Sequence, residues 1–198
     1  DAVIIENGIV LKAVKTPTSK DITSGVTEAL SRLRTESAAQ DDVDGVMIGT
    51  THFVNAVVQR RQLTPVGALR IGEPVSATLP PFCDWPADLA EIVRGGVWSA
   101  AGGHEYDGRE VMPFDEAAVL RASQTMCERG LDAVSISGIF SPLDPSHEQR
   151  AGEIMAKEMP EASITLSSDL GRIGLLEREN AALLNATLSV LAQQTIDA

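Results

Sequence analysis

The sequence predicts an α/β fold in which helices flank a largely parallel or mixed sheet. Segments with strand and helix patterns alternate along the chain, and such alternation requires crossover connections. Continuous apolar runs at Val46–Ile48, Val134–Ile139 and Ile164–Leu166 are typical of strands that are buried on both faces. The chain has 198 residues, 43% of them apolar, which is enough for a sizeable core. We expect a single domain over residues 1–198.

The first predicted elements are a β-hairpin and a helix. Asp1–Glu6 is a strand, Asn7-Gly8 favours a two-residue hairpin turn, and Ile9–Lys15 is the returning strand. Lys20–Ala38 is predicted to be helical because its apolar residues recur at helical spacing. A hairpin at the first residue leaves an apolar edge that another strand should cover. We therefore expect a piece of a longer protein, with a natural start after processing as the alternative.

Helices and strands alternate through the rest of the chain. Further helices are predicted to begin near Gly49–Thr51, Asp115, Asp144-Pro145 and Leu176, and further strands to cover 45–48, 65–71, 132–140 and 163–166. Asp115 is a favourable N-cap, and Gly130 is a favourable end for the same helix. Pro160 should end the next helix, and the last helix should continue to about Gln194.

Residues 72–113 differ in composition from the rest of the chain. Prolines and glycines are frequent there, and both tryptophans and the only tyrosine lie in this segment. Because aromatic side chains bury large areas, Phe82, Trp85, Trp98 and Tyr106 favour an ordered, irregular insertion over a free linker. Loops of this length are usually functional or disordered.

Composition argues against several classes of protein. The formal net charge of −12 disfavours a nucleic-acid or anionic-membrane surface. No apolar run approaches the roughly 18 residues of a membrane-spanning helix. Cys83 and Cys127 have no metal-ligand spacing, so we expect two free, buried thiols in a reducing compartment. These observations predict a cytoplasmic protein with no nucleic-acid and no membrane partner.

One candidate ligand site lies at the start of a helix. Thr50, Thr51, His52 and Asn55 follow a predicted strand, where unpaired N–H groups and the helix dipole attract an anion or a carbonyl group. The structural alternative is that a threonine only caps the helix and His52 packs against a neighbour. The segment lacks the lysine of a phosphate-binding P-loop.

Two later segments are open to a functional or a structural interpretation. Ser167–Arg172 follows a predicted strand, at the edge where α/β sheets bind ligands, although an ordinary loop explains it equally well. Asn180 interrupts the apolar face of the last helix, with Glu177 and Arg178 beside it. A buried amide needs a partner, either in the core or in a ligand.

A metal site is a weaker hypothesis. His104, Glu105 and Asp107 lie within four residues of one another, but such a run is more often a glycine-bounded turn with solvated charges. Strand alternation would also place Glu105 and Asp107 on the side away from His104. We therefore assign no metal site. The sequence contains no Gly-x-Ser-x-Gly elbow and no cysteine beside a histidine, so a catalytic residue stays unknown.

Several longer strings resemble the N-terminal region of the hydantoinase/5-oxoprolinase family. They are VKTPTSKDITSGVTEAL, MIGTTHFVNAVVQRR, PPFCDWP, GGHEYDGRE, SGIFSPLDPSHEQRA and GRIGLLERENAALLNATL. The resemblance implies one lobe of an actin-like ATPase fold, in a parent protein that is an ATP-dependent hydrolase opening cyclic amides of the hydantoin or 5-oxoproline type. Similar proteins include ATP-using subunits of ketone carboxylases, so the alternative is such a subunit or a non-catalytic binding subunit.

The resemblance also implies cofactors, partners and site residues. The family places an Asp-x-Gly-Gly-Thr-x-Thr loop for the ATP phosphates before the residue that matches Asp1. We therefore expect ATP and Mg²⁺ in the parent protein, and neither ligand nor activity in residues 1–198 alone. The expected partners are a small cyclic amide and a second hydantoinase subunit or a further copy of the chain. The residues expected to contact substrate or nucleotide are Thr50, Thr51, His52, Asn55, Glu177, Arg178 and Asn180.

Overall fold

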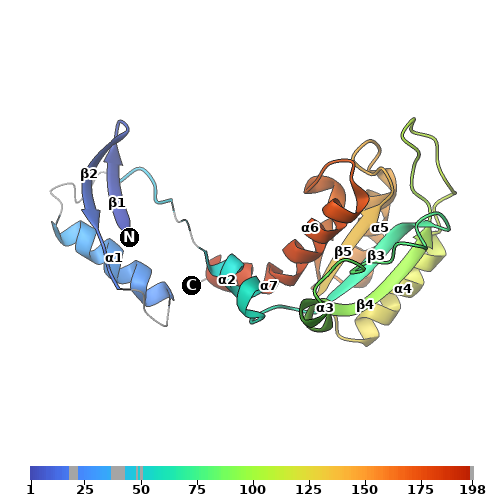
Figure 1. The fold of residues 1–198 in the computed structure, drawn as a ribbon, viewed down its shortest axis with the longest axis horizontal. Coiled ribbons are helices and arrows are strands. Elements are labelled where there is room, and N and C mark those ends of the chain that lie inside the picture. The colour runs from blue at the N-terminus through green and yellow to red at the C-terminus, as the bar shows by residue number, and fades with distance from the viewer. Residues whose placement is uncertain (18–21, 37–42, 48, 50, 197–198) are drawn as a thin grey trace. The chain divides into compact units, whose positions relative to one another are not determined.

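The computed structural model describes residues 1–17, 22–36, 43–47, 49 and 51–196. The chain divides into two compact units, Asp1–Thr50 and Thr51–Asp197 (Figure 1). A single domain over the whole chain stays a prediction. Among the described residues, no helix combines the length and the apolar character needed to span a membrane.

The first unit is a β-hairpin with a helix beside it. Its elements are β1 (Ala2–Glu6), β2 (Ile9–Val14) and α1 (Ile22–Glu36). The two strands pair antiparallel, and Asn7 and Gly8 make the turn with φ values of 49° and 78°. Val14 on β2 and Leu33 on α1 are buried. The predicted hairpin and helix are therefore confirmed.

The second unit is built on a parallel sheet of four strands. In order across the sheet these are β4 (Arg94–Ala101), β3 (Val66–Glu73), β5 (Ala133–Gly138) and β6 (Ser163–Leu166). β3 lies in the middle, and its residues 66–72 are all buried. β5 is buried over its whole length. This architecture confirms the predicted α/β class.

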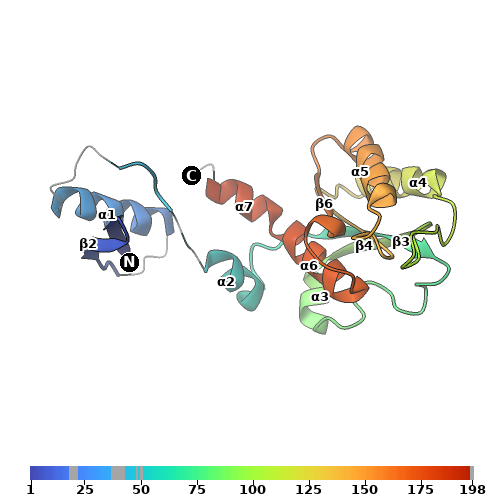
Figure 2. The same ribbon diagram turned by 90° about the horizontal axis from the view of Figure 1, so that it is seen from above.

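Helices cover both faces of the sheet (Figure 2). The helices of this unit are α2 (His52–Gln59), α3 (Ala87–Val93), α4 (Glu116–Glu128), α5 (Ser146–Glu158), α6 (Leu175–Thr187) and α7 (Ser189–Ile196). Of these, α3, α4, α5 and α6 pack against the sheet. On one face, α4 and α5 pack Met126 and Met155 against sheet residues such as Ile136. On the other, α3 and α6 bury Val93 and Leu183.

Helix termini follow the sequence signals closely. The Asp115 carboxylate accepts a hydrogen bond from the Ala118 N–H at 2.9 Å and so caps α4. Gly130 follows the end of this helix with φ of 65°, a conformation that costs glycine little. α5 ends before Pro160, as predicted. The last predicted helix, by contrast, divides at Leu188 into α6 and α7.

The strand predicted at Val46–Ile48 is wrong for the part that the structure describes. Val46 and Met47 form no strand and are 60% and 101% exposed, while Ile48 lies outside the described residues. A short apolar run is compatible with several structures, and these side chains are not covered by the described part of the chain. The predicted strands at 134–139 and 164–166 are confirmed as β5 and β6, with Ile139 just beyond the end of β5.

Residues 72–113 include regular elements where the sequence predicts an irregular insertion. They contain α3 and the edge strand β4. Gly95 and Gly96 lie inside β4, where a Cβ on Gly96 would come within 2.4 Å of the Trp98 ring. These glycines therefore make room for side chains and do not mark a loop. Phe82 packs edge-on against Trp85 at 4.9 Å between ring centroids, whereas Tyr106 is exposed.

The expectation for the cysteines is corrected in one respect. Cys83 and Cys127 are both free thiols, but both are exposed. Cys127 lies in α4, on the side away from the core. The apolar character of the two thiols was therefore not sufficient to predict their burial.

Candidate functional site

Polar side chains gather at the carboxyl edge of the sheet, where parallel sheets bind ligands. β4 leads into Gly102 and His104, β5 into Ser141, and β6 into Ser167. Two separate arrangements form there. We call His104, Glu110 and His147 the histidine cluster. The core network consists of buried and half-buried residues joined by hydrogen bonds: Gly138, Ser141, Glu148, Ser167, Ser168 and Arg178.

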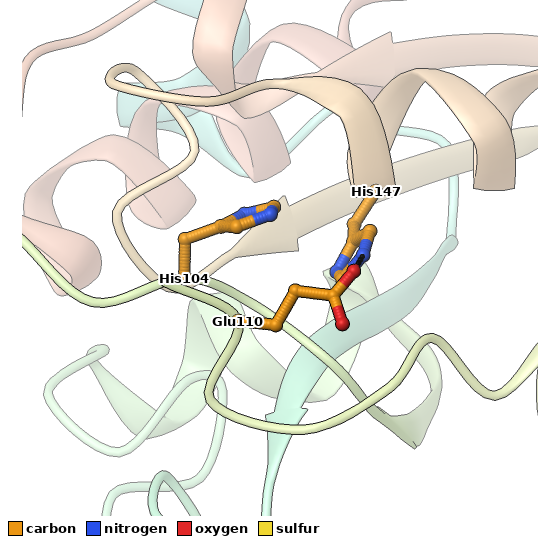
Figure 3. Close-up of side chains that lie close together, drawn as sticks. All are labelled: His104, Glu110 and His147. Atoms are coloured by element: carbon orange, nitrogen blue, oxygen red, sulfur yellow. Dashed lines mark ion pairs between the residues drawn. The ribbon is translucent and has the colours of Figure 1, made fainter. Parts of the chain in front are cut away.

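The histidine cluster joins a loop to the start of a helix (Figure 3). His104 and Glu110 lie on the loop after β4, where they face each other in an isolated antiparallel bridge. His147 lies in the first turn of α5. One nitrogen of each histidine and one carboxylate oxygen all lie within 4.8 Å of one another. His147 Nε2 is 3.3 Å from a Glu110 carboxylate oxygen, and the ring centroids of His104 and His147 are 4.4 Å apart.

Burial differs sharply within the cluster. His104 and His147 are 3% and 8% exposed, whereas the Glu110 side chain is 56% exposed. Burial, reinforced by the neighbouring His104, lowers the pKa of His147 below its ordinary value, although Glu110 acts in the opposite direction. Neutral imidazole is the form that binds metal ions. Asp144 adds a carboxylate oxygen 3.6 Å from His104 Nε2.

Backbone contacts hold one ring and the main chain beside the other. The backbone N–H of His104 donates to the Ile139 carbonyl at 3.2 Å. The Gly103 N–H donates to His147 Nδ1 at 3.0 Å, which places the imidazole proton on Nε2, toward Glu110. Gly102 has φ of 139°, and a Cβ there would lie 2.6 Å from Ile71 and 3.1 Å from His147 Nδ1. The glycine pair thus lets the backbone approach the buried ring.

Glu148 is the centre of the core network. It is fully buried, and its carboxylate accepts four hydrogen bonds. The donors are the Gly138 N–H at 2.6 Å, the Ser141 hydroxyl at 2.5 Å, the Ser167 hydroxyl at 2.6 Å and the Ser168 N–H at 2.9 Å. A buried carboxylate requires such partners. Glu148 therefore joins the segments that follow β5 and β6.

Arg178 completes this network from α6. Its guanidinium donates to Ser167 Oγ at 2.8 Å and to the carbonyls of Arg172 and Ile173 at 2.9 and 3.0 Å. A further bond reaches the Gly138 carbonyl. Burial lowers the pKa of Arg178, while the buried carboxylates of Glu148 and Glu179 oppose that shift. The side chain is 2% exposed, so its contacts are internal.

A buried ion pair joins α6 to the sheet. Arg70 on β3 pairs with Glu179 on α6, and both side chains are 2% exposed. The Ser137 hydroxyl donates to the Glu179 carboxylate at 2.6 Å. Arg70 also donates to the Leu79 carbonyl. This pair fastens α6 to the two central strands.

The described residues of the predicted site at the start of α2 contact one another and their neighbours on the same helix. Thr50 lies outside the described residues. Thr51 occupies the N-cap position, and among the described residues its side chain makes no capping hydrogen bond. It accepts a hydrogen bond from the Asn55 amide at 3.4 Å, and the His52 ring lies 6.0 Å from that of Phe53.

The predicted residues on α6 point in different directions. Asn180 accepts a hydrogen bond from Trp85 Nε1 at 2.7 Å and donates to Asp84 at 2.9 Å, so it has the partner that its position requires. Glu177 and Arg178 line a shallow depression of about 340 Å³. The depression is lined by Leu170, Gly171, Arg172, Gly174, Glu177, Arg178 and Ala181. Asn180 and the described residues at the start of α2 do not line it.

The histidine cluster is not evident as a set from the sequence. In the sequence His104 lies beside Glu105 and Asp107, but Asp107 pairs with Arg109 at 2.8 Å. Glu110 and His147 take their place beside His104. One signal was available, because His147 opens the helix after a predicted strand and so belongs at the carboxyl edge. His104 reaches the same edge because it follows β4. The sequence of β4 suggests a loop, so it does not indicate this position.

The whole chain is similar to several known proteins. Residues 1–159 match the family described as the hydantoinase/oxoprolinase N-terminal region. The chain is 28% identical over 189 residues to the caprolactamase alpha subunit of Pseudomonas jessenii, covering 87% of this chain and 26% of that protein. It is 33% identical over 97 residues to the acetophenone carboxylase gamma subunit of Aromatoleum aromaticum, covering 46% of this chain and 13% of that protein.

Solved structures show the same fold. The ATP-dependent caprolactamase of Pseudomonas jessenii matches with a TM-score of 0.70 at 22% identity, over 98% of this chain and 30% of that one. Nucleotide-free acetone carboxylase matches with a TM-score of 0.62 at 18% identity, over 86% of this chain and 27% of that one. Both have the actin-like ATPase type of fold. The chain thus spans about a quarter to a third of the caprolactamase and acetone carboxylase chains it matches.

Proposed function

We propose, because the chain belongs to the hydantoinase/oxoprolinase family, that its parent protein is an ATP-dependent hydrolase of cyclic amides of the hydantoin or 5-oxoproline type. The observation that carries the proposal is the similarity to the caprolactamase alpha subunit, which extends over 87% of this chain. Caprolactam is itself a cyclic amide. Its hydrolysis shares the breaking of a ring C–N bond with the opening of hydantoins and 5-oxoproline.

The chemistry explains why such an enzyme would need ATP. An amide carbon is a poor electrophile, because the nitrogen lone pair is delocalised onto the carbonyl oxygen. Transfer of the γ-phosphoryl group from ATP to that oxygen releases ADP and gives an imidate phosphate, whose carbon is a better electrophile. Water can then add to this carbon, and inorganic phosphate is the leaving group. Phosphoryl transfer depends on Mg²⁺ and on well-placed donors around the phosphates. ATP and Mg²⁺ are therefore the cofactors that we propose for the parent protein.

We propose that the carboxyl edge of the sheet and the start of α2 contribute to this chemistry. The candidate contacts to substrate or nucleotide are Thr50, Thr51, His52, Asn55, Glu177, Arg178 and Asn180. Glu177 is supported by its exposed place beside the depression at the start of α6. For Arg178, whose guanidinium is internal, we propose the indirect role of shaping the segment 172–174 that borders the same depression.

An ATP-using subunit of a ketone carboxylase is the second candidate function. It is favoured by the 33% identity to the acetophenone carboxylase gamma subunit. Both curated relatives carry subunit names, so we propose that the parent works with a second, different subunit or with a further copy of itself. A cytoplasmic location and the absence of nucleic-acid and membrane partners belong to the same proposal.

The decisive experiment follows ADP release by the parent protein purified with its partner subunit. We expect hydantoin or 5-oxoproline to stimulate ADP release and to yield the ring-opened acid, detected by mass spectrometry. A ketone with bicarbonate serves as the competing substrate pair. Stimulation by ketone and bicarbonate, with no ring opening, would assign the second function in place of the first.

A further inference from the structure

We propose that His104, Glu110 and His147 form a binding site for a divalent transition-metal ion, with Zn²⁺ as the representative ion. Two imidazoles and one carboxylate are a common ligand set for zinc and related metals. Mg²⁺ prefers a shell made of oxygen atoms. The site therefore differs in its ligands from a site for the Mg²⁺ that accompanies ATP. A metal ion bound here would be additional to the cofactors of the proposed function.

The distances leave little rearrangement to be made. Zinc binds nitrogen and carboxylate oxygen at about 2.0–2.2 Å, so two ligand atoms of a tetrahedral site lie roughly 3.4 Å apart. The three candidate atoms already lie within 4.8 Å of one another, and His147 Nε2 is 3.3 Å from Glu110. Glu110 is exposed and lies on a loop (Figure 3). A shift of this one side chain can close the site.

The scaffold around the cluster supports metal binding in two ways. Both histidines are buried, and the main chain at His104 is held by the hydrogen bond from its backbone N–H to the Ile139 carbonyl. Asp144 lies beside His104 Nε2 at 3.6 Å, and carboxylates beside ligating histidines orient the ring. Three protein ligands leave the fourth position of a tetrahedral site open. This is the pattern of a site that accepts water or a substrate atom.

One contact must change when the metal binds. The proton on His147 Nε2 has to leave that atom before the nitrogen can coordinate, and it moves to Nδ1. The Gly103 N–H, which now donates to Nδ1, then loses its acceptor. Gly103 has φ of 85° and no side chain, so its peptide can turn more freely than that of another residue. Metal binding should therefore alter the environment of the Gly103 amide.

The test is a calorimetric titration of metal-free chain 1–198 with ZnCl₂, alongside MgCl₂. We expect one Zn²⁺ per chain and no comparable heat with Mg²⁺. Glu110→Gln removes a ligand from an exposed position, and we expect it to weaken Zn²⁺ binding by at least about tenfold. Glu105→Gln is the matched control, because it makes the same change in the same loop outside the cluster, and it should bind Zn²⁺ as the unaltered chain does.

Two readouts separate coordination at this site from adventitious binding elsewhere. The visible spectrum of bound Co²⁺ should report nitrogen and oxygen ligands in the unaltered chain and in Glu105→Gln, and should be lost in His147→Gln. The amide resonance of Gly103 should shift on addition of Zn²⁺. Absence of saturable Zn²⁺ binding, or equal affinity in Glu110→Gln and the unaltered chain, would overturn the proposal. The circular dichroism of each metal-free variant checks that it is folded.

Discussion

The histidine cluster and the core network lie at the same edge of the same sheet, yet their polar atoms are used differently. In the core network, the Glu148 carboxylate accepts four hydrogen bonds from the chain itself. In the histidine cluster, Glu110 is 56% exposed and faces two imidazoles whose ring nitrogens lie close to its own oxygen atoms. The first arrangement is saturated, and the second brings ligand atoms together around a common point.

Hydrogen-bond saturation and burial distinguish structural from functional polar groups better than residue type does. Both arrangements contain a glutamate and a basic side chain near the carboxyl edge of the sheet. A saturated network stabilises the fold, because removing one member leaves buried groups without partners. A cluster with an exposed member contributes little to stability and stays available to a ligand. Substitutions in the two arrangements should therefore have opposite consequences for stability and for binding.

The largest effect is expected for Glu148→Ala. It leaves two serine hydroxyls and two backbone N–H groups without their acceptor. It also removes a negative charge that favours the buried Arg178 guanidinium. We expect the free energy of unfolding to fall by about 3–5 kcal/mol, measured by urea denaturation. Glu153→Ala on the same helix is the control, since its ion pair with Arg150 is exposed, and it should change stability by less than about 0.5 kcal/mol. A loss below about 1 kcal/mol for Glu148→Ala would contradict the structural role.

The next effect concerns the Arg70–Glu179 pair. Glu179→Leu should cost about 3 kcal/mol, because it leaves a buried guanidinium without its counter-charge. Arg70→Met combined with Glu179→Leu should be more stable than Glu179→Leu alone, since replacing both charges restores an apolar contact. A double-mutant cycle by thermal or urea unfolding measures the coupling. Simple additivity of the two single losses would show that the charges are not paired as described.

A moderate effect is expected for Asn180→Leu. The change removes the hydrogen bonds to Trp85 and Asp84 at a half-buried position. We expect a loss of roughly 1–2 kcal/mol, together with a shift in tryptophan fluorescence. In the parent enzyme, Thr51→Ala is the companion change at the other predicted contact. For either variant, lower turnover with an unchanged melting temperature supports a ligand contact at the substituted residue. A lower melting temperature with intact turnover removes the substituted residue from the proposed site.

The smallest effect on stability is expected for Glu110→Gln. Its carboxylate is exposed, and exposed ion pairs contribute little. We expect a change below about 0.5 kcal/mol in the metal-free chain, measured in the same urea series as Glu148→Ala. The same variant should lose the stabilisation that Zn²⁺ gives to the unaltered chain. A large loss of stability without metal would place Glu110 with the structural residues.

Local signals in the sequence were sufficient for elements whose structure depends on neighbours in the chain. Asn7-Gly8 indicated the hairpin, and Asp115 with Gly130 indicated both ends of α4. β4 was missed because Gly95 and Gly96 suggest a loop, while their role is to admit Trp98 and Leu131. That role depends on contacts between distant residues. Propensity and periodicity do not contain this information.

The candidate site was predictable only in part for the same reason. The need of Asn180 for a partner could be inferred from its place on an apolar helix face, but the partners Trp85 and Asp84 lie some 95 residues earlier. Glu148 lies in a helix rich in charged residues, where a solvated position is the ordinary expectation. Two segments that are distant in the sequence, at the ends of β5 and β6, bring its donors together. The histidine cluster likewise depends on the placement of β4 beside β3.

The measurement that tests the comparison most directly is anomalous diffraction at the zinc edge from crystals of the chain grown with Zn²⁺. The account predicts a peak about 2.0–2.2 Å from one atom each of His104, Glu110 and His147, with Glu148 and Arg178 unchanged in their internal hydrogen bonds. A map with no peak among these three side chains, or with zinc bound only at other surface residues, would contradict the assignment of the histidine cluster as a binding site.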